Sequence, residues 1–294
     1  MRLFDLHCDT LGEIFRRGET MFDNTCHIEL NKAFSVLEDY TQVMAIWSEH
    51  HLSDDENYGR CLAALDYAEK HLFGIPNFTP ILAVEGGKLL NGDISRLDTL
   101  AQRGVKIFTL VWRDVCHIGG AFNNSEGLSD FGKEVVCRLL ELGITPDLSH
   151  SNDEICYQAI ELAKTVKKPL IASHSCSRSV YRHPRNISDG VAKEVASLGG
   201  VIGVNFVSDH LGGREVEIVL RHMDYIKNIC GEGAVCLGTD FDGTSDDTLP
   251  LGIENIGRIG VLYDAIAKKY HSEAFADAVF CNNAQSFAEK YIFA

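Results

Sequence analysis

Ionisable side chains occur repeatedly at the ends of apolar segments in this chain. Carboxylates and imidazoles are the side chains that most often bind metal ions and transfer protons. The six residues in these positions are His7, Asp9, Glu85, His150, His174 and Asp240. One histidine after an apolar segment would more often be a capping or core residue than a ligand. Six such groups buried together would instead need a metal ion or a proton to neutralise them.

The residue types indicate which metal this set would bind. Three imidazoles with two or three carboxylates and no thiolate cluster suit zinc, with manganese or iron as alternatives. His7 and Asp9 are two residues apart, so both side chains lie on the same side of one strand. Five ligand groups exceed the needs of one tetrahedral zinc ion and fit two ions, with Glu85 as the candidate bridge. Two ions about 3.5 to 4 Å apart can hold a bridging hydroxide and polarise a carbonyl group.

The apolar segments that carry these residues are predicted to be strands, because they alternate with segments of helical spacing. They are apolar throughout, as expected for parallel strands covered on both faces. Eight strands that alternate with helices predict an α/β fold of the closed (β/α)8, TIM-like barrel type. A doubly wound open sheet is the alternative. The eight expected strands cover residues 2–9, 41–47, 79–87, 104–112, 144–150, 168–174, 199–206 and 233–240.

This architecture would bring the six polar groups together. In a (β/α)8 barrel the C-terminal ends of the strands lie on one face, which carries the active site. The six groups come from five of the expected strands and would point into one bowl. A chain of 294 residues has the length of two average domains, but a barrel can use all of it as one. We therefore expect a single domain over residues 1–294, with two C-terminal helices at about 254–291 packed outside the barrel.

Composition and charge limit the partners of the chain. Hydrophobic residues make up 45% of it, and acidic residues outnumber basic ones 42 to 27. The net charge of −15 repels phosphate backbones and anionic lipids, which argues against nucleic acid and membrane partners. The start, MRLFDLHCDT, lacks the apolar run of a signal peptide, and the ten cysteines form no CxxC pair. We therefore expect a cytoplasmic protein with a small-molecule substrate and the homodimer as a candidate assembly.

Several short motifs occur in order along the chain. They are His7-x-Asp9-Thr10, AVEGG at 83–87, EGLSDFG at 126–132, DLSH at 147–150, SHS at 173–175, RN at 185–186, VNF at 204–206 and GTDFDG at 238–243. This series resembles the renal (membrane) dipeptidase family of zinc peptidases, a branch of the metal-dependent amidohydrolase-type barrels. The resemblance extends from the first expected strand to the last helices.

The resemblance implies a role for each site residue. It implies a binuclear zinc centre, in which Glu85 binds both ions. The implied ligands are His7, Asp9 and Glu85 for one ion and Glu85, His150 and His174 for the other. It further implies that Asp240 shuttles protons and that Arg185 binds the terminal carboxylate of the substrate.

The chain departs from the family pattern at Trp112, in a loop that is expected to bind substrate. Animal members carry there a histidine that contacts the scissile carbonyl, and some bacterial-type relatives share the tryptophan. We interpret Trp112 as a subfamily feature that affects substrate range. Arg113 and His117 follow in the same loop and are candidates to replace the histidine, although such residues are more often solvated.

The sequence as a whole predicts a zinc-dependent dipeptidase that uses a metal-bridging hydroxide, with substrates that include dipeptides ending in a D-residue. One alternative is a metal-dependent hydrolase of another amide, a lactam or an ester. The other is a metal-binding relative without turnover, which is motivated only by Trp112. Retention of the five ligands and of Asp240 argues against this second alternative.

Overall fold

The computed structural model describes residues 1–293, and within them seven parallel strands form one curled sheet in an α/β arrangement. The strand order across the sheet is β5-β4-β3-β2-β1-β7-β6. The strands are β1 (Arg2–Cys8), β2 (Asp39–Trp47), β3 (Phe78–Glu85), β4 (Val105–Thr109), β5 (Thr145–Asp147), β6 (Ile202–Val204) and β7 (Val235–Leu237). Each of these strands lies within or overlaps a segment that was predicted to be a strand.

The segment expected to form the sixth strand, residues 168–174, makes only single bridges to its neighbours. Asp147 pairs with Ile171, and Ala172 pairs with Ile202, both in parallel orientation. Pro169 lacks a backbone N–H, so this segment cannot form a continuous ladder from its start. The residues that follow it turn away into the loop that carries His174.

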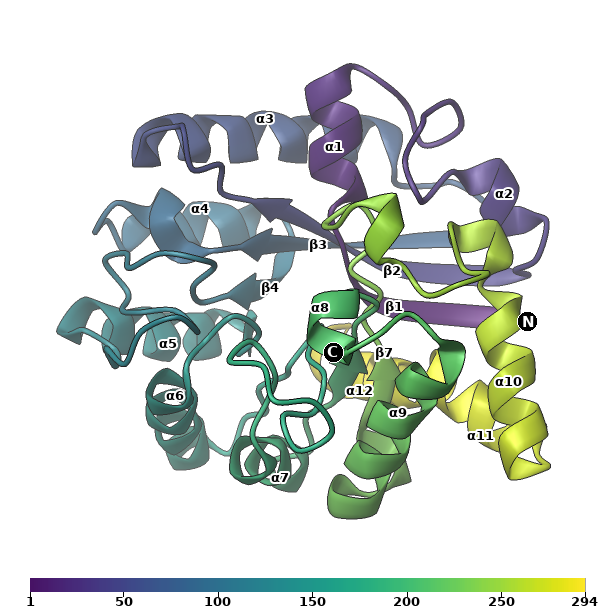
Figure 1. Ribbon diagram of the computed structural model, residues 1–294. Helices are drawn as coiled ribbons and strands as arrows, with labels where there is room; N and C mark the ends of the chain where they lie inside the picture. The colour runs from purple at the N-terminus through teal and green to yellow at the C-terminus, as the bar shows by residue number, and fades with distance from the viewer. Residues whose placement is uncertain (294) are drawn as a thin grey trace.

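Helices surround the curled sheet in Figure 1. The α-helices are α1 (Thr10–Arg17), α2 (Leu30–Phe34), α3 (Asp54–His71), α4 (Ser95–Gln102), α5 (Asp130–Leu142), α6 (Asp153–Val166), α7 (Asp189–Ser197), α8 (Ser208–Leu211), α9 (Val216–Cys230), α10 (Gly260–Tyr270), α11 (Glu273–Asp277) and α12 (Asn283–Tyr291). The short helical segments are η1 (Gly87–Leu90), η2 (Glu232–Ala234), η3 (Asp246–Thr248), η4 (Ile256–Arg258) and η5 (Ala278–Asn282).

Local sequence signals determine where several helices begin and end. The Asn152 side chain accepts a hydrogen bond from the Ile155 N–H at the start of α6, and the Ser129 hydroxyl accepts one from the Gly132 N–H at the start of α5. Gly143 ends α5 with a φ of 72°, a left-handed conformation that glycine adopts without strain. These caps determine where α5 and α6 begin and where α5 ends.

The strands are buried on both faces, as their continuous apolar sequences predicted. One apolar cluster lies between the sheet and the helices, and a second lies on the inner face of the sheet. Along β3 the inner face reads Ile81, Ala83 and then Glu85, so it changes from apolar to charged at the C-terminal end. The polar groups therefore meet beside an apolar interior at one end of the strands.

The C-terminal segments η5 and α12 pack near the end of the sheet that lies away from the polar residues. Side chains of η5 and α12, among them Cys281, Ala284 and Phe287, join the inner apolar cluster together with Phe4 of β1. In Figure 1, α12 (yellow) lies behind the centre of the sheet. This helix therefore covers inner-face residues near the start of the strands, away from the polar end.

Candidate metal centre

The structure brings all six predicted ionisable residues together. They lie at the C-terminal ends of the strands or just beyond them, and five of the six residues are buried while His150 is partly exposed. The gathered residues are His7, Asp9, Glu85, His150, His174 and Asp240. This convergence is the arrangement that the order of strands and polar residues predicted.

Glu85 and two histidines form the tighter half of this cluster. Its Oε1 atom lies 2.8 Å from His150 Nε2 and 3.3 Å from His174 Nε2. The two Nε2 atoms are 3.0 Å apart. Two ligand atoms on one tetrahedral zinc ion with bonds of about 2.0 to 2.1 Å are about 3.3 Å apart. The three atoms are therefore spaced as ligands of one ion.

His7 is the centre of the second half. Its Nε2 atom lies 3.9 Å from Asp9 Oδ2, 3.7 Å from Glu85 Oε1 and 3.8 Å from Asp240 Oδ1. Within residues 1–293, the buried atoms His7 Nε2 and Asp9 Oδ1 have no hydrogen-bond partner. Buried polar atoms are nearly always satisfied, so these two atoms require a further ligand such as a cation. Asp240 lies as close to His7 as the expected ligands do.

Burial shifts the pKa values of these groups in the direction that removes their charge. It raises the pKa of Glu85 well above its usual range, and repulsion from Asp240 adds to this shift. Burial lowers the pKa of His7 to about 3 and holds those of His150 and His174 well below their usual range. The imidazoles are therefore neutral, the form that binds metal ions. A cation would keep the nearby carboxylates ionised, so the donor set fits a metal centre.

Unusual backbone conformations help to place the site. His150 and Asp240 have φ values of 68° and 63°, in the left-handed region that residues with a Cβ rarely adopt. Gly243 lies so close to Asp9 and Asp240 that an added Cβ would clash with carboxylate oxygens of both residues. Strained residues of this kind persist where the surrounding structure holds them, and they are concentrated at functional sites.

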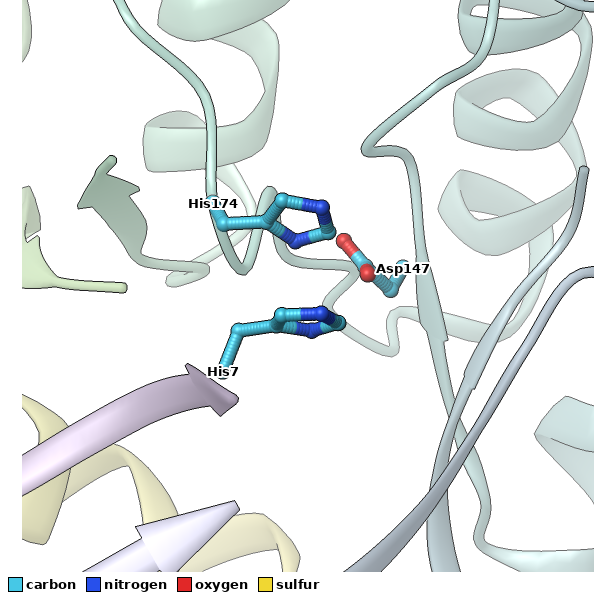
Figure 2. Close-up of side chains that lie close together, drawn as sticks. All are labelled: His7, Asp147 and His174. Atoms are coloured by element: carbon cyan, nitrogen blue, oxygen red, sulfur yellow. The ribbon is translucent and has the colours of Figure 1, made fainter. Parts of the chain in front are cut away.

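Asp147 lies beside His7 and His174, as Figure 2 shows. The two imidazole rings are stacked, with centroids 3.7 Å apart. Asp147 is nevertheless fully engaged, because Oδ1 accepts backbone N–H groups of Ser149 (3.0 Å) and Ser173 (2.8 Å). Its Oδ2 atom accepts hydroxyl groups of Thr109 (2.6 Å) and Ser173 (2.6 Å). Four donors leave no lone pair directed at a metal ion, so we interpret Asp147 as a support for the ligands.

The hydrogen bond between Ser173 and Asp147 determines which nitrogen of His174 carries the proton. The Ser173 hydroxyl has one hydrogen, which it donates to Asp147. It therefore accepts a hydrogen bond from His174 Nδ1–H, 2.7 Å away. The proton on Nδ1 leaves the lone pair of Nε2 free toward Glu85. Ligating histidines commonly depend on such an outer hydrogen bond for their tautomer and orientation.

A cavity of about 470 Å³ opens above these residues. Arg185, which was predicted to bind the terminal carboxylate of the substrate, lines this cavity and is 3% exposed. Its guanidinium donates to Ser175 Oγ (3.3 Å) and to the His174 carbonyl (3.2 Å), while its buried Nε has no partner within residues 1–293. Arg185 thus reaches the cavity with unused hydrogen-bonding capacity.

Trp112, which was predicted to bind substrate, lines the same cavity. It follows β4, whose last residue is Thr109, so the strand is shorter than the predicted one. The Trp112 ring lies 5.5 Å from that of Trp47 and 4.5 Å from that of His50, measured between centroids. These aromatic side chains surround the position of Trp112. Animal members of the renal dipeptidase family, which the sequence resembles, carry a histidine at this position.

Of the two candidates to replace the family histidine, Arg113 lines the cavity and His117 does not. The His117 side chain is about half exposed and lies 3.7 Å from Asp54. Sequence reasoning did not single out Asp147, which entered only as part of a motif, or the cavity residues His183 and His210. The only signal for Asp147 was its place three residues before His150. His183 lies in a loop and His210 in the four-residue helix α8, and neither segment is long enough to show a periodicity.

Comparison with known proteins identifies the family. The family model described as membrane dipeptidase (peptidase family M19) matches residues 66–290. The chain belongs to this family. A protein described as an uncharacterized dipeptidase of Schizosaccharomyces pombe is 29% identical over 242 residues, which are 79% of this chain and 56% of that protein. The chain thus spans about half the length of this curated relative.

Solved structures of other metallopeptidases share the fold. The metallopeptidase named dipeptidase AC superposes with a TM-score of 0.90 at 23% identity, over 100% of this chain and 99% of its own. A metallopeptidase from Rhodobacter sphaeroides, liganded with a phosphinate mimic of the dipeptide L-Ala-D-Ala, gives a TM-score of 0.88 at 23% identity over 99% of both chains. Among residues 1–293 we find no helix with the length and apolar character needed to cross a bilayer.

Proposed function

We propose that this protein is a dipeptidase with two zinc ions, which hydrolyses the peptide bond of dipeptides including those that end in a D-residue. The observation that carries the proposal is the convergence of three imidazole Nε2 atoms, within 3.7 Å, on the Oε1 atom of Glu85. Membership of the membrane dipeptidase family and the dipeptide mimic bound to the Rhodobacter relative support the same activity.

Two groups of residues would hold the ions. His7 and Asp9 would bind one, His150 and His174 the other, and Glu85, which lies within 4 Å of imidazoles from both groups, would bridge them. Bound zinc would lower the pKa of a water molecule and polarise the substrate carbonyl. Asp147 and Ser173 would keep His174 in the tautomer that presents Nε2.

Asp240 would move the proton during hydrolysis. Burial raises its pKa to about 6, against the opposing effect of the Arg185 charge. A carboxylate at this position can accept the proton of the attacking water and return it to the leaving amine. Its place 3.8 Å from His7 Nε2 puts it at the edge of the metal centre.

Arg185 would select substrates by their length, because it would bind the terminal carboxylate. Its guanidinium reaches the cavity from a buried position, where a charge-assisted contact with a carboxylate is strong. A dipeptide whose terminal carboxylate binds there would place its single peptide bond at the metal centre. Trp112 and Trp47 would bound the remaining space of the cavity.

We also propose that the sheet is closed as a (β/α)8 barrel in one domain. Backbone hydrogen bonds on both sides of residues 170–172 support closure between β5 and β6. Leu148 N–H donates to Ile171 O (2.8 Å), Ala172 N–H to Val201 O (3.1 Å) and Gly203 N–H to Ala172 O (2.8 Å).

Hydrolysis of matched dipeptides tests the function. The zinc-loaded protein should cleave L,L- or L,D-dipeptides, lose activity with a chelator, and favour a free acid over its C-terminal amide. A charged contact of about 1.5 to 3 kcal/mol predicts that Arg185→Met lowers kcat/KM about ten- to a hundredfold on the acid and little on the amide. Equal hydrolysis of acid and amide by the unaltered protein would contradict dipeptide recognition and favour another amide, lactam or ester.

A further inference from the structure

Two histidines that have no part in the metal centre lie beside Arg185 in the cavity. His183 precedes Arg185 by two residues, and His210 belongs to the short helix α8. Their ring centroids are 5.0 Å apart, and both line the cavity together with Arg185. These two histidines and Arg185 line a cavity whose other charged residues are mostly carboxylates.

The protein determines the tautomer of His210. The Asn205 side chain has a known orientation, because its Oδ1 atom accepts the Val207 backbone N–H at 3.2 Å. Its Nδ2 group therefore donates to His210 Nδ1 (3.0 Å) and to the His174 carbonyl (3.2 Å). Since Nδ1 of His210 accepts, a neutral His210 carries its proton on Nε2. Within residues 1–293, that Nε2–H has no protein partner.

His183 has the same tautomer for a separate reason. The backbone N–H of Arg185 donates to His183 Nδ1 at 3.2 Å. The remaining nitrogen, Nε2, must then carry the proton of the neutral ring. Both histidines thus offer an N–H donor on the edge of the ring opposite to the one held by the protein.

Both rings are held in the neutral form. Burial lowers the pKa of His210 to about 2, and the Arg185 guanidinium adds to the effect. Burial and Arg185 also lower the pKa of His183, against the opposing charge of Asp209. The two histidines therefore supply directed donors without adding positive charge to the cavity.

We propose that His183 and His210 complete, with Arg185, a binding site for the terminal carboxylate of the substrate. A carboxylate has about four lone-pair positions, more than one guanidinium edge can fill, so Nε2–H donors beside it can take the rest. The Arg185 guanidinium and the two Nε2–H groups all donate, so these three side chains together favour a carboxylate over the NH2 group of an amide. This inference rests on the proposed dipeptidase function and names specificity-determining residues for it.

Paired substitutions of His210 test the site. Glutamine can place an N–H near the position of Nε2, whereas leucine fills the space without a donor. We expect His210→Leu to raise KM for a free-acid dipeptide about tenfold, with kcat little changed, because one hydrogen bond to a charged group is lost. His210→Gln should restore most of the affinity, and neither change should alter KM for the C-terminal amide. The same pair at His183 should act in the same direction.

Controls separate this inference from the proposed function. His71→Leu, at the exposed end of α3, should leave every kinetic constant unchanged, and thermal unfolding shows whether each variant folds. Calorimetric binding of a non-hydrolysable phosphinate dipeptide to the zinc-loaded protein should show the same loss for His210→Leu as KM does. If the unaltered protein prefers acid to amide but His210→Leu and His183→Leu do not weaken binding of the acid, the inference is wrong and the dipeptidase assignment stands. If the unaltered protein shows no preference, both are wrong.

Discussion

At the scale of single residues, hydrogen bonds from residues outside the ligand set determine the tautomer and orientation of the site residues. Ser173 illustrates this, because its one hydroxyl links a saturated carboxylate to the Nδ1 atom of a histidine ligand. Asp5 plays a similar part under the other half of the site, where it accepts the backbone N–H (2.8 Å) and the hydroxyl (2.6 Å) of Thr239, next to Asp240. His174 and the segment that carries Asp240 are therefore each held by a buried carboxylate, Asp147 or Asp5.

Ser173→Ala should weaken the metal site without unfolding the protein. The change removes the acceptor of His174 Nδ1–H, so the ring can rotate or adopt the other tautomer, and outer-shell losses of this kind cost about ten- to a hundredfold in metal affinity. Competition with a zinc chelator measures the affinity directly. Ser173→Thr keeps the hydroxyl and should retain most of it. Unchanged affinity in the alanine variant would show that the tautomer does not depend on Ser173.

Asp240→Asn distinguishes a proton carrier from a ligand. If Asp240 transfers the proton, the amide variant should keep most of its zinc yet lose about a hundredfold or more in kcat. Its distance of 3.8 Å from His7 Nε2 makes metal content the decisive measurement. Parallel loss of zinc and activity would instead identify Asp240 as an essential ligand.

At the scale of elements, the sequence predicted the seven strands because each overlaps a largely apolar segment. The convergence of polar residues followed from parallel strand order and needed no side-chain detail. The supporting and donor residues could not be predicted in this way. His210 lies in a four-residue helix, whereas Asn205 and Arg185 belong to loops. In such segments no periodicity indicates which side chains face the cavity. The single bridges of residues 170–172 were not predicted either, although Pro169, which lacks a backbone N–H, was a signal in the sequence against a continuous ladder.

The loop after β7 gives a prediction at this scale. An added Cβ at Gly243 would clash with Asp9 and with Asp240, so Gly243→Ala must move the loop or displace the two carboxylates. We expect at least a tenfold loss of zinc affinity, on the scale of a disturbed ligand shell, with only a modest change in melting temperature. Gly233→Ala is a matched control, because nothing lies within 4 Å of its added Cβ. Equal zinc affinity in both variants would refute the role of this close approach.

At the scale of the whole molecule, the inner face of the sheet joins two different environments. Apolar side chains from the strands meet η5 and α12 near one end, while carboxylates and imidazoles gather at the other. The sequence indicated C-terminal helices but not this contact, because helical spacing does not reveal a partner surface that is distant in the chain. We therefore expect stability to depend on one end of the strands and the proposed substrate recognition on the other.

Phe287→Ala tests this separation. Phe287 is 4% exposed and packs into the inner apolar cluster, so its truncation should lower the free energy of unfolding by about 3 to 5 kcal/mol. Phe293→Ala, at a side chain that is 50% exposed, should cost far less in the same denaturant titration. Because the change lies at the end away from the cavity, KM for a dipeptide should stay within about twofold below the melting temperature. A large rise in KM with folded protein would mean that α12 supports the geometry of the site through the strands, and the two ends would then have to be treated as one cooperative unit.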